Sequence, residues 1–254
     1  MKLFVVLPAY DERGNIGRLL GRIDTALRPV GLASRIVLVD DGSTDGTSDA
    51  ARQAEVSIPL HVIRFARNEG VGEALAAGLR YVCAHGRDDD LCFTMDADDT
   101  HDPSLLGPMS ELLRKGADIV VASRFLPGGG MSGCPPGRAL LSRGVASLMS
   151  RACPGVGITD FSTFYRGYRV GIVRQVMRRH GDRIPAGRGF ESYARFLVEA
   201  ASLADRIEEV PARLDYRRKR GASKMRLAGT IVGYLRVAAG AWIRSSPFGR
   251  LGLR

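Results

Sequence analysis

The first 125 residues alternate short apolar runs with stretches of helical periodicity. Helical patterns occur near residues 15–28, 45–55, 71–85 and 103–115. The apolar runs between them predict five strands, at Leu3–Leu7, Arg35–Val39, Leu60–Phe65, Leu91–Met95 and Asp118–Ala122. Strands and helices that alternate at this spacing are typical of βαβ units. The sequence therefore predicts an α/β fold with a mostly parallel sheet flanked by helices.

The second half of the chain departs from this rhythm. Residues 126–138 contain five glycines and three prolines, which predicts a long, mobile functional loop. The remaining elements that we expect are helices near 139–152 and 190–201, a strand at Glu208–Tyr216, a basic turn at Arg217–Ser223 and a final helix at Leu227–Ile243.

The final helix has an uneven distribution of side chains. Apolar residues from Leu227 to Trp242 recur on one side, whereas Arg226, Arg236 and Arg244 share the other. A basic amphipathic helix with an aromatic anchor is typical of a segment that lies in a membrane interface, although a helix packed on its own domain gives the same pattern. We therefore expect a globular domain over residues 1–222 and a basic amphipathic segment at a membrane surface over residues 223–254.

The charge of the chain is concentrated at its C-terminal end. Of the formal net charge of +10, residues 201–254 contribute twelve Lys or Arg against four Asp or Glu. A basic end of this kind suits a phosphate-bearing partner, whether a nucleic acid, a lipid headgroup or a small ligand. The four cysteines and four histidines lack zinc-ligand spacing, and the N-terminus has no signal-peptide pattern, so we expect a cytoplasmic protein.

Two carboxylates directly follow the predicted strand Leu91–Met95. In an extended segment, residues two apart point to the same side, so Asp96 and Asp98 can present both side chains to one cation. Carboxylates together with substrate phosphates are the ligands that Mg²⁺ or Mn²⁺ prefers. An acidic surface loop is the ordinary alternative.

Polar residues also follow the first two strands. Asp40 and Asp41 precede a glycine turn, and Tyr10 and Glu12 follow Pro8. A turn with a helix cap explains part of this pattern. Because ligands of parallel sheets bind beyond the carboxyl ends of the strands, these side chains are also candidates for contacts to a nucleoside.

The ordered motifs resemble those of a known enzyme family. They read Leu-Pro-Ala-Tyr-Asp-Glu, Val-Asp-Asp-Gly-Ser-x-Asp-Gly-Thr, Met-Asp-Ala-Asp-x-x-His, Ala-Ser-Arg-Phe-x-x-Gly-Gly and Glu-Val-Pro followed by Arg-x-x-Gly-x-Ser-Lys. Over about residues 3–225 the chain resembles the family-2 glycosyltransferases of the dolichyl-phosphate (polyprenyl-phosphate) mannose synthase group. This resemblance implies a GT-A fold.

The resemblance also implies roles for particular residues. Arg124 and Arg143 would contact the acceptor phosphate, and Asp96, Asp98 and Arg124 would form the catalytic centre, with the metal on Asp96 and Asp98. The residues expected to contact the nucleotide-sugar are Pro8, Tyr10, Glu12, Val39, Asp40, Asp41, Asp96, Ala97, Asp98, Arg218 and Lys224.

The implied reaction is the inverting transfer of a hexose, mannose from GDP-mannose, onto a polyprenyl phosphate at the cytoplasmic face of a membrane. A phosphate monoester has a second pKa of about 6, so this nucleophile is ionised without a side-chain base. The segments Asp160–Arg166 and Phe190–Tyr193 depart from the family pattern and leave a UDP-sugar donor or a non-lipid acceptor as alternatives.

Two further classes of protein fit the sequence less well. A nucleic-acid-binding module is not favoured, because the charge lies in one tail without aromatic residues interleaved on a basic strand. A sugar-nucleotide pyrophosphorylase is not favoured either, because the glycine-rich basic loop that it needs near the N-terminus is missing from the sequence. The Gln-x-x-Arg-Trp motif of processive polysaccharide synthases is also missing from the sequence. The sequence does not show whether the protein needs a membrane-protein partner.

Overall fold

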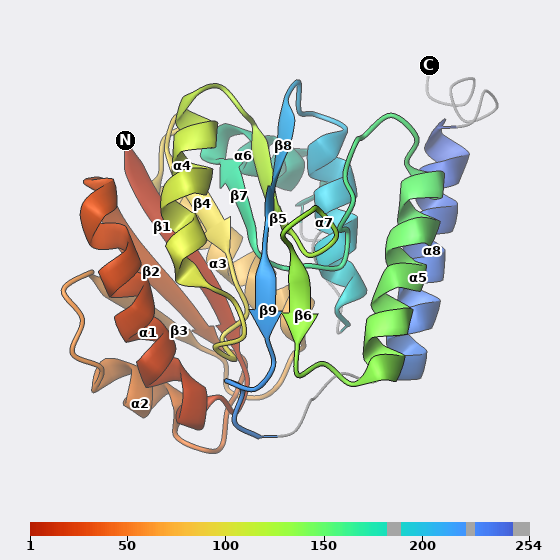
Figure 1. The fold of residues 1–254 in the computed structure, drawn as a ribbon. Coiled ribbons are helices and arrows are strands. Elements are labelled where there is room, and N and C mark those ends of the chain that lie inside the picture. The colour runs from red at the N-terminus through yellow and green to blue at the C-terminus, as the bar shows by residue number, and fades with distance from the viewer. Residues whose placement is uncertain (182–188, 222–226, 246–254) are drawn as a thin grey trace.

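The computed structural model describes residues 1–181, 189–221 and 227–245 and centres on one seven-stranded sheet (Figure 1). Its strand order is β3-β2-β1-β4-β7-β5-β8, and every pairing is parallel except those of β7 with its two neighbours. The strands are β1 (Lys2–Ala9), β2 (Ala33–Asp40), β3 (Leu60–Arg64), β4 (Leu91–Thr94), β5 (Ile119–Ser123), β7 (Arg166–Arg169) and β8 (Ile207–Pro211). The predicted α/β class and the five predicted N-terminal strands are confirmed.

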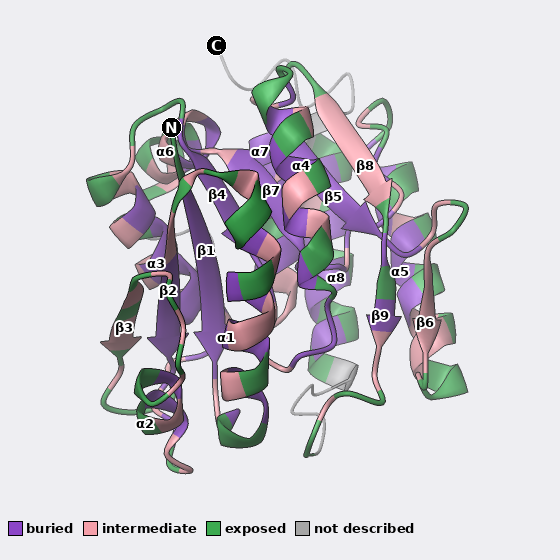
Figure 2. Cartoon of the chain, turned by 60° about the vertical axis from the view of Figure 1, so that its left-hand side comes forward, coloured by how far each residue is buried: buried purple, intermediate pink, exposed green. Residues whose placement is uncertain are grey.

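Helices cover both faces of the sheet. Successive side chains of a strand point to opposite sides, so a strand that is apolar throughout contributes to a core on each face. Leu3, Val5 and Leu7 of β1 belong to one apolar core, and Phe4 and Val6 belong to the other. The first core is closed by α1 (Arg13–Leu27), α2 (Thr47–Arg52) and α4 (Leu106–Arg114). The second is closed by α3 (Val71–His85), α5 (Pro136–Ala152), α6 (Val170–His180), α7 (Glu191–Ala201) and α8 (Leu227–Ser245). Figure 2 shows the buried sheet between these two layers.

A second, two-stranded sheet joins segments that the sequence suggested were a loop and one long strand. In it β6 (Gly130–Ser132) pairs in parallel with β9 (Arg213–Asp215). The expected strand Glu208–Tyr216 is therefore divided between two sheets. Ala212 lies at the division, where its amide donates to Ser123 of β5 and its carbonyl accepts from Gly130.

Strand β7 and helix α6 were not predicted. The strand has the polar sequence Arg-Gly-Tyr-Arg, which forms no apolar run. The guanidinium of Arg166 is buried, and it donates to the carbonyls of Phe161 and Tyr193. A Cβ atom at Gly167 would lie 2.6 Å from the ring of Phe93, so only glycine fits between the strand and its neighbour. Neither feature produces a hydrophobic pattern in the sequence.

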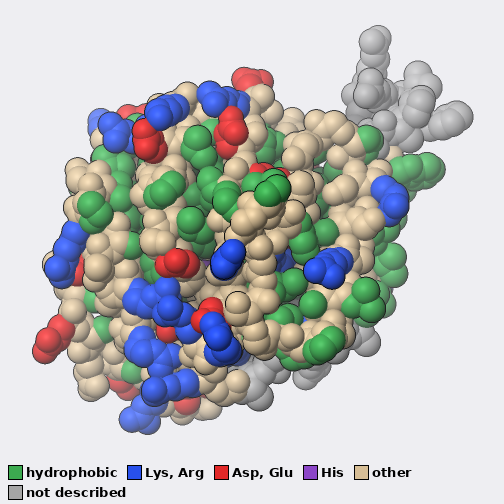
Figure 3. All heavy atoms as spheres, in the orientation of Figure 1, with side chains coloured by type: hydrophobic (Ala, Val, Ile, Leu, Met, Phe, Trp, Pro, Cys, Tyr) green, Lys and Arg blue, Asp and Glu red, His purple; other side chains and the backbone are tan. Residues whose placement is uncertain are grey.

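Helix α8 packs against α5 and α7, and it buries Tyr234, Val237, Ala238 and Ala241 in the second core. Its other side exposes five large apolar residues: Ile231, Val232, Leu235, Trp242 and Ile243. Leu140 of α5 is also exposed. Hydrophobic side chains accordingly line the edge of the molecule over these two helices (Figure 3). Among the described residues, none of the helices has both the length and the apolar character required to span a bilayer.

Candidate active site

The carboxyl ends of β1, β2 and β4 bring the predicted polar segments to one edge of the sheet. The amide of Asp41 donates to Ala9, and the amide of Glu12 donates to the hydroxyl of Thr47. These hydrogen bonds connect the end of β1 to the turn after β2. The predicted convergence of these segments on one edge is therefore a feature of the structure.

Asp96 and Asp98, which follow β4, are both held by neighbouring side chains. His101 is buried, and its Nε2 atom lies 3.0 Å from Oδ2 of Asp96. Oδ2 of Asp98 lies 2.8 Å from Nζ of Lys219, and its Oδ1 accepts from both the amide and the hydroxyl of Thr100. Burial raises the pKa of Asp98, but Lys219, Thr100 and His101 together outweigh burial and keep this pKa below its ordinary value.

The loop after these aspartates is fixed from the first helix. Asp99 adopts a φ of 63° and is almost completely buried. Its carboxylate forms ion pairs with Arg18 at 3.3 Å and with Arg22 at 2.6 Å. Because both arginines project from α1, the loop that carries Asp96 and Asp98 is anchored to a rigid element.

The two carboxylates at the carboxyl end of β2, Asp40 and Asp41, are used mainly inside the protein. Asp40 is fully buried, and it accepts from the amide of Ser43 and the hydroxyl of Ser48. Asp41 accepts from the amides of Glu69 and Gly70 and so holds the turn before α3. Burial raises the pKa of Asp41. The structure thus gives both residues a role in shaping the edge of the sheet.

The other predicted donor contacts at this edge vary in exposure. Pro8, Val39 and Ala97 are buried, so only backbone atoms or small faces of these residues are open to a ligand. Tyr10 is half-buried. Glu12 is almost buried, and its carboxylate accepts a hydrogen bond of 2.6 Å from Asn15.

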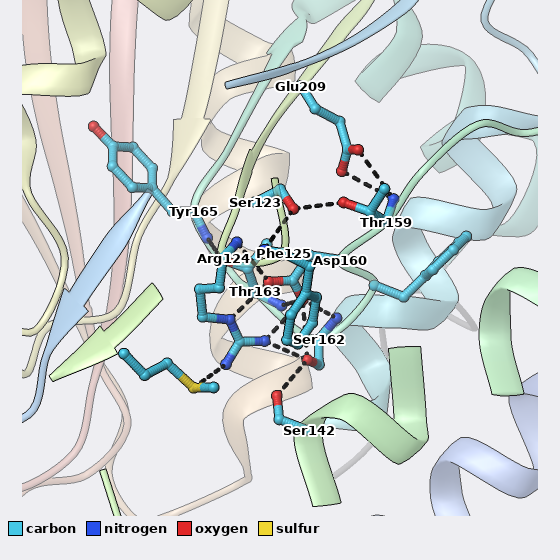
Figure 4. Close-up of polar contacts among 12 residues, drawn as sticks. Ser123, Arg124, Phe125, Ser142, Thr159, Asp160, Ser162, Thr163, Tyr165 and Glu209 are labelled. Atoms are coloured by element: carbon cyan, nitrogen blue, oxygen red, sulfur yellow. Dashed lines mark hydrogen bonds and ion pairs between the residues drawn. The ribbon is translucent and has the colours of Figure 1, made fainter. Parts of the chain in front are cut away.

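Arg124 follows β5 and is clamped by a buried carboxylate (Figure 4). Its Nε and Nη2 atoms donate to Asp160 at 2.7 and 2.8 Å, and Nη2 also donates to Ser162. Burial lowers the pKa of Arg124, but Asp160 more than offsets this, so the guanidinium stays charged. The Nη1 atom has a thioether, Met131, at 3.7 Å, and sulfur is a weak acceptor.

One cavity connects Asp96 with Arg124. Helix α5 contributes Arg138 and Ser142 to its wall, and the stacked rings of Phe164 and Tyr193 form another side. The other lining residues are His101, Leu141, Val145, Ser162, Thr163, Phe190, Leu214, Tyr216, Thr230 and Tyr234. The cavity therefore presents a carboxylate and two guanidinium groups to the same space, between α5 and α8.

Two predicted phosphate ligands, Arg143 and Arg218, lie elsewhere in the described residues. Arg143 is exposed on α5 and does not line this cavity. Arg138 of the same helix lines the cavity, and its guanidinium group lies 5.0 Å from the centre of the Tyr216 ring. Arg218 lines a separate groove of about 790 Å³ on α1, together with Arg18, Arg22, Arg217 and Arg220. Lys224 lies outside the described residues.

Sequence reasoning missed four residues of the site: Lys219, Arg138, Asp160 and Tyr193. Lys219 and Arg138 look like ordinary surface charges in the sequence, and only the tertiary fold brings them to the carboxylates and the cavity. Asp160 was visible as a departure from the family pattern, but its pairing with Arg124 joins residues 36 positions apart.

The donor set at the edge fits a hard divalent cation. Asp96 offers a carboxylate whose side chain is 31 % exposed, and Asp98 offers a second one that already attracts an ammonium group. Within the described residues no group of three or more His, Cys, Asp or Glu side chains is arranged around one point as a metal site. Oxygen ligands in this number match a cation that shares its coordination with substrate phosphates.

The chain is similar in sequence to a family of glycosyltransferases and to three of its relatives. The profile of the family described as Glycosyl transferase family 2 matches residues 4–177. An undecaprenyl-phosphate mannosyltransferase from Micrococcus luteus is 35 % identical over 244 residues, covering 95 % of this chain and 94 % of that protein. A polyprenol monophosphomannose synthase from Mycolicibacterium smegmatis is 34 % identical, covering 69 % of this chain and 64 % of that protein. A dolichol-phosphate mannosyltransferase from Pyrococcus furiosus is 32 % identical, covering 93 % and 62 %.

Solved structures share the fold at low sequence identity. S. aureus TarS 1–349 in complex with UDP-GlcNAc superposes with a TM-score of 0.65 at 18 % identity, covering 98 % of this chain and 69 % of that one. Glucosyl-3-phosphoglycerate synthase from Mycobacterium tuberculosis, in complex with Mn²⁺, UDP and glucosyl-3-phosphoglycerate, superposes with a TM-score of 0.62 at 20 % identity, covering 95 % and 78 %. The sheet and its flanking helices thus have the GT-A arrangement.

Proposed function

Because the chain belongs to glycosyl transferase family 2, we propose that it transfers mannose from GDP-mannose to a polyprenyl phosphate. The names of three relatives with 32 to 35 % identity support this substrate class, and the chain spans most of the first of them but less than two thirds of the other two. The observation that carries the proposal is the cavity in which Asp96, Arg124 and Arg138 face the same space.

The donor would lie over the carboxyl ends of β1, β2 and β4. Pro8, Tyr10 and Glu12 would bound the nucleoside, and the turn that Asp41 holds would close its other side. Asp96 and Asp98 would bind Mg²⁺ or Mn²⁺ together with the oxygens of the diphosphate. When bound, the cation neutralises the negative charge that grows on the departing nucleoside diphosphate.

The acceptor phosphate would lie in the cavity between α5 and α8. Arg124, Arg138 and Ser142 line this cavity, and we expect them to bind the phosphate group. Because a phosphate monoester is already ionised near neutral pH, an oxygen of the acceptor attacks the anomeric carbon directly and the nucleoside diphosphate leaves from the opposite face. The two guanidinium groups offset the repulsion between the anionic acceptor and the anionic donor.

The lipid chain would leave the cavity along the exposed apolar sides of α5 and α8. Leu140, Ile231 and Leu235 are from 39 to 72 % exposed, and Trp242 extends the same apolar surface along α8. An apolar face on a helix that also carries Arg236 suits the interface of a bilayer. We therefore propose that the protein binds peripherally to the cytoplasmic face of a membrane, with residues 223–254 as its contact segment.

The test is a transfer assay with purified protein, undecaprenyl or dolichyl phosphate, and a panel of radiolabelled nucleotide sugars. We expect label in the organic phase with GDP-mannose and Mg²⁺ or Mn²⁺, and we expect EDTA to remove it. Label from UDP-glucose or UDP-GlcNAc alone would change the donor but keep the acceptor. Label that stays in the water phase on a soluble saccharide would refute the lipid acceptor.

A further inference from the structure

Lys219 is the inward-facing member of a strongly basic segment. The segment Arg217–Arg220, called the strap below, follows β9 and contacts both α1 and Asp98. Arg217 and Arg218 have side chains that are 71 and 47 % exposed, whereas that of Lys219 is 15 % exposed. Its ammonium group lies 2.8 Å from Oδ2 of Asp98, one of the two carboxylates assigned to the metal.

The strap is held in this position by α1. The side-chain amide of Asn15 donates to the carbonyl of Arg220 at 3.0 Å and accepts from the amide of Arg220 at 2.9 Å. Arg18 donates to the carbonyl of Arg218 at 2.9 Å. Backbone contacts on both sides of Lys219 therefore direct its side chain toward the carboxylates.

The ammonium group is surrounded by negative charge. The side chain of Lys219 is only 15 % exposed, and it pairs with Asp98, whose side chain is also 15 % exposed. The position beside Asp98 and near Asp96 and Glu12 is also where a divalent cation would gain most from the same charges. One positive charge is thus already in place at the donor site.

We propose that Lys219 is a resident counter-ion of the donor site: it occupies Asp98 until the metal and the nucleoside diphosphate arrive together, and then pairs with the diphosphate. A divalent ion alone must displace the ammonium group, so it binds weakly. The diphosphate compensates for this displacement because it offers Lys219 a new anionic partner. Binding of metal and nucleotide is then coupled through one side chain.

This inference rests on the proposed donor site and is tested by binding rather than by turnover. Calorimetric titrations with Mn²⁺ alone, and with GDP in the absence of metal, are compared for the wild type and Lys219→Met. Lys219→Arg keeps the charge on the strap. Lys115→Met is the matched control, because Lys115 forms a pair of 2.7 Å with Glu111 on the exposed side of α4.

We expect Lys219→Met to bind Mn²⁺ about tenfold more tightly than the wild type and metal-free GDP about tenfold more weakly, since one charge pair near a protein surface has this order of effect. Lys219→Arg and Lys115→Met should match the wild type. If Lys219→Met does not fold by circular dichroism, Lys219→Gln, which keeps a hydrogen-bond donor for Asp98, replaces it with the same expected shifts.

Unchanged Mn²⁺ affinity in a folded Lys219→Met or Lys219→Gln variant overturns the role of Lys219 and leaves the donor site intact, provided that the wild type binds Mn²⁺ with GDP. A wild type that binds neither GDP nor Mn²⁺ with GDP overturns both the donor site and the counter-ion.

Discussion

The guanidinium group of Arg124 and the carboxylate of Asp160 form a two-pronged ion pair, with N–O distances of 2.7 and 2.8 Å, away from solvent. Arg124 comes after β5, and Asp160 comes from the segment before β7. The pair also aligns the amides of Ser162 and Thr163, both of which donate to Asp160. Asp160 therefore fixes both the direction of Arg124 and the wall of the cavity between Asp96 and Arg124.

Removal of this carboxylate should be strongly destabilising. Asp160→Ala leaves the buried guanidinium without its counter-ion, and breaking one side of a buried pair costs about 3–5 kcal/mol. We expect the free energy of unfolding, measured in urea, to fall by this amount. Glu111→Ala breaks an exposed pair with Lys115 and should change the free energy of unfolding by less than about 1 kcal/mol. Equal effects in the two variants would show that the buried pair has no special role.

The same pair predicts a pH dependence of stability. Burial raises the pKa of Asp160, but Arg124 and the surrounding donors outweigh it and hold the pKa below its ordinary value of 3.8. A carboxyl group with a depressed folded-state pKa gives its full stabilisation above about pH 4 and loses it as the pH falls through the folded-state value.

The wild type should therefore be more stable than Asp160→Asn near neutral pH, and this difference should shrink on acidification. Urea unfolding of both proteins between neutral pH and about pH 3 measures the difference directly. A difference that stays constant over that range contradicts an ionised Asp160 in the folded protein.

Arg138, rather than Arg143, should bind the acceptor phosphate. A hydrogen bond to a charged group contributes about 1.5–3 kcal/mol, so Arg138→Ala should raise the KM for polyprenyl phosphate by about ten- to a hundredfold and leave GDP binding unchanged. Arg143→Ala is the matched control, because Arg143 lies exposed on the same helix. The opposite ranking of the two variants would restore the sequence-based choice of Arg143.

The exposed face of α8 should contribute to membrane binding and little to stability. Leu235 and Trp242 are 50 and 62 % exposed. Replacing both with Glu should weaken cosedimentation with anionic vesicles by about tenfold or more, since about 25 cal/mol is lost for each Å² of apolar surface kept out of the bilayer. The midpoint of thermal unfolding should shift little. Gln53→Glu adds one charge at an exposed position far from α8 in the sequence and serves as the control.

If the double variant sediments with vesicles as the wild type does, the apolar face of α8 is not the membrane contact. A large loss of thermal stability would show that this face packs against the protein instead.

The elements that the sequence predicted well are those with local patterns. The strands of residues 3–122 and the helices between them have clear apolar periodicity, and the acidic residues follow these strands directly. The resemblance to family 2 and the GT-A fold are confirmed by the family profile and the solved structures.

The features that were missed depend on contacts between distant residues. Strand β7 is polar in sequence, and it is buried between β4 and β5 with the side chain of Arg166 donating to two carbonyl groups. Lys219 reaches Asp98 across 121 positions. Neither contact has a local pattern, because burial of a charged group depends on partners that only the complete fold supplies.

We propose above all that Asp96 and Asp98 bind the cation that activates a sugar donor for a lipid phosphate. The most direct test of this proposal is the transfer of radiolabelled mannose from GDP-mannose to polyprenyl phosphate by the wild type and by Asp98→Ala, with folding of both proteins checked by circular dichroism. We predict metal-dependent label in the lipid fraction for the wild type and a loss of at least about a hundredfold in the variant, as expected when a main electrostatic contact to the transition state is removed. Equal turnover by the two folded proteins would contradict the account.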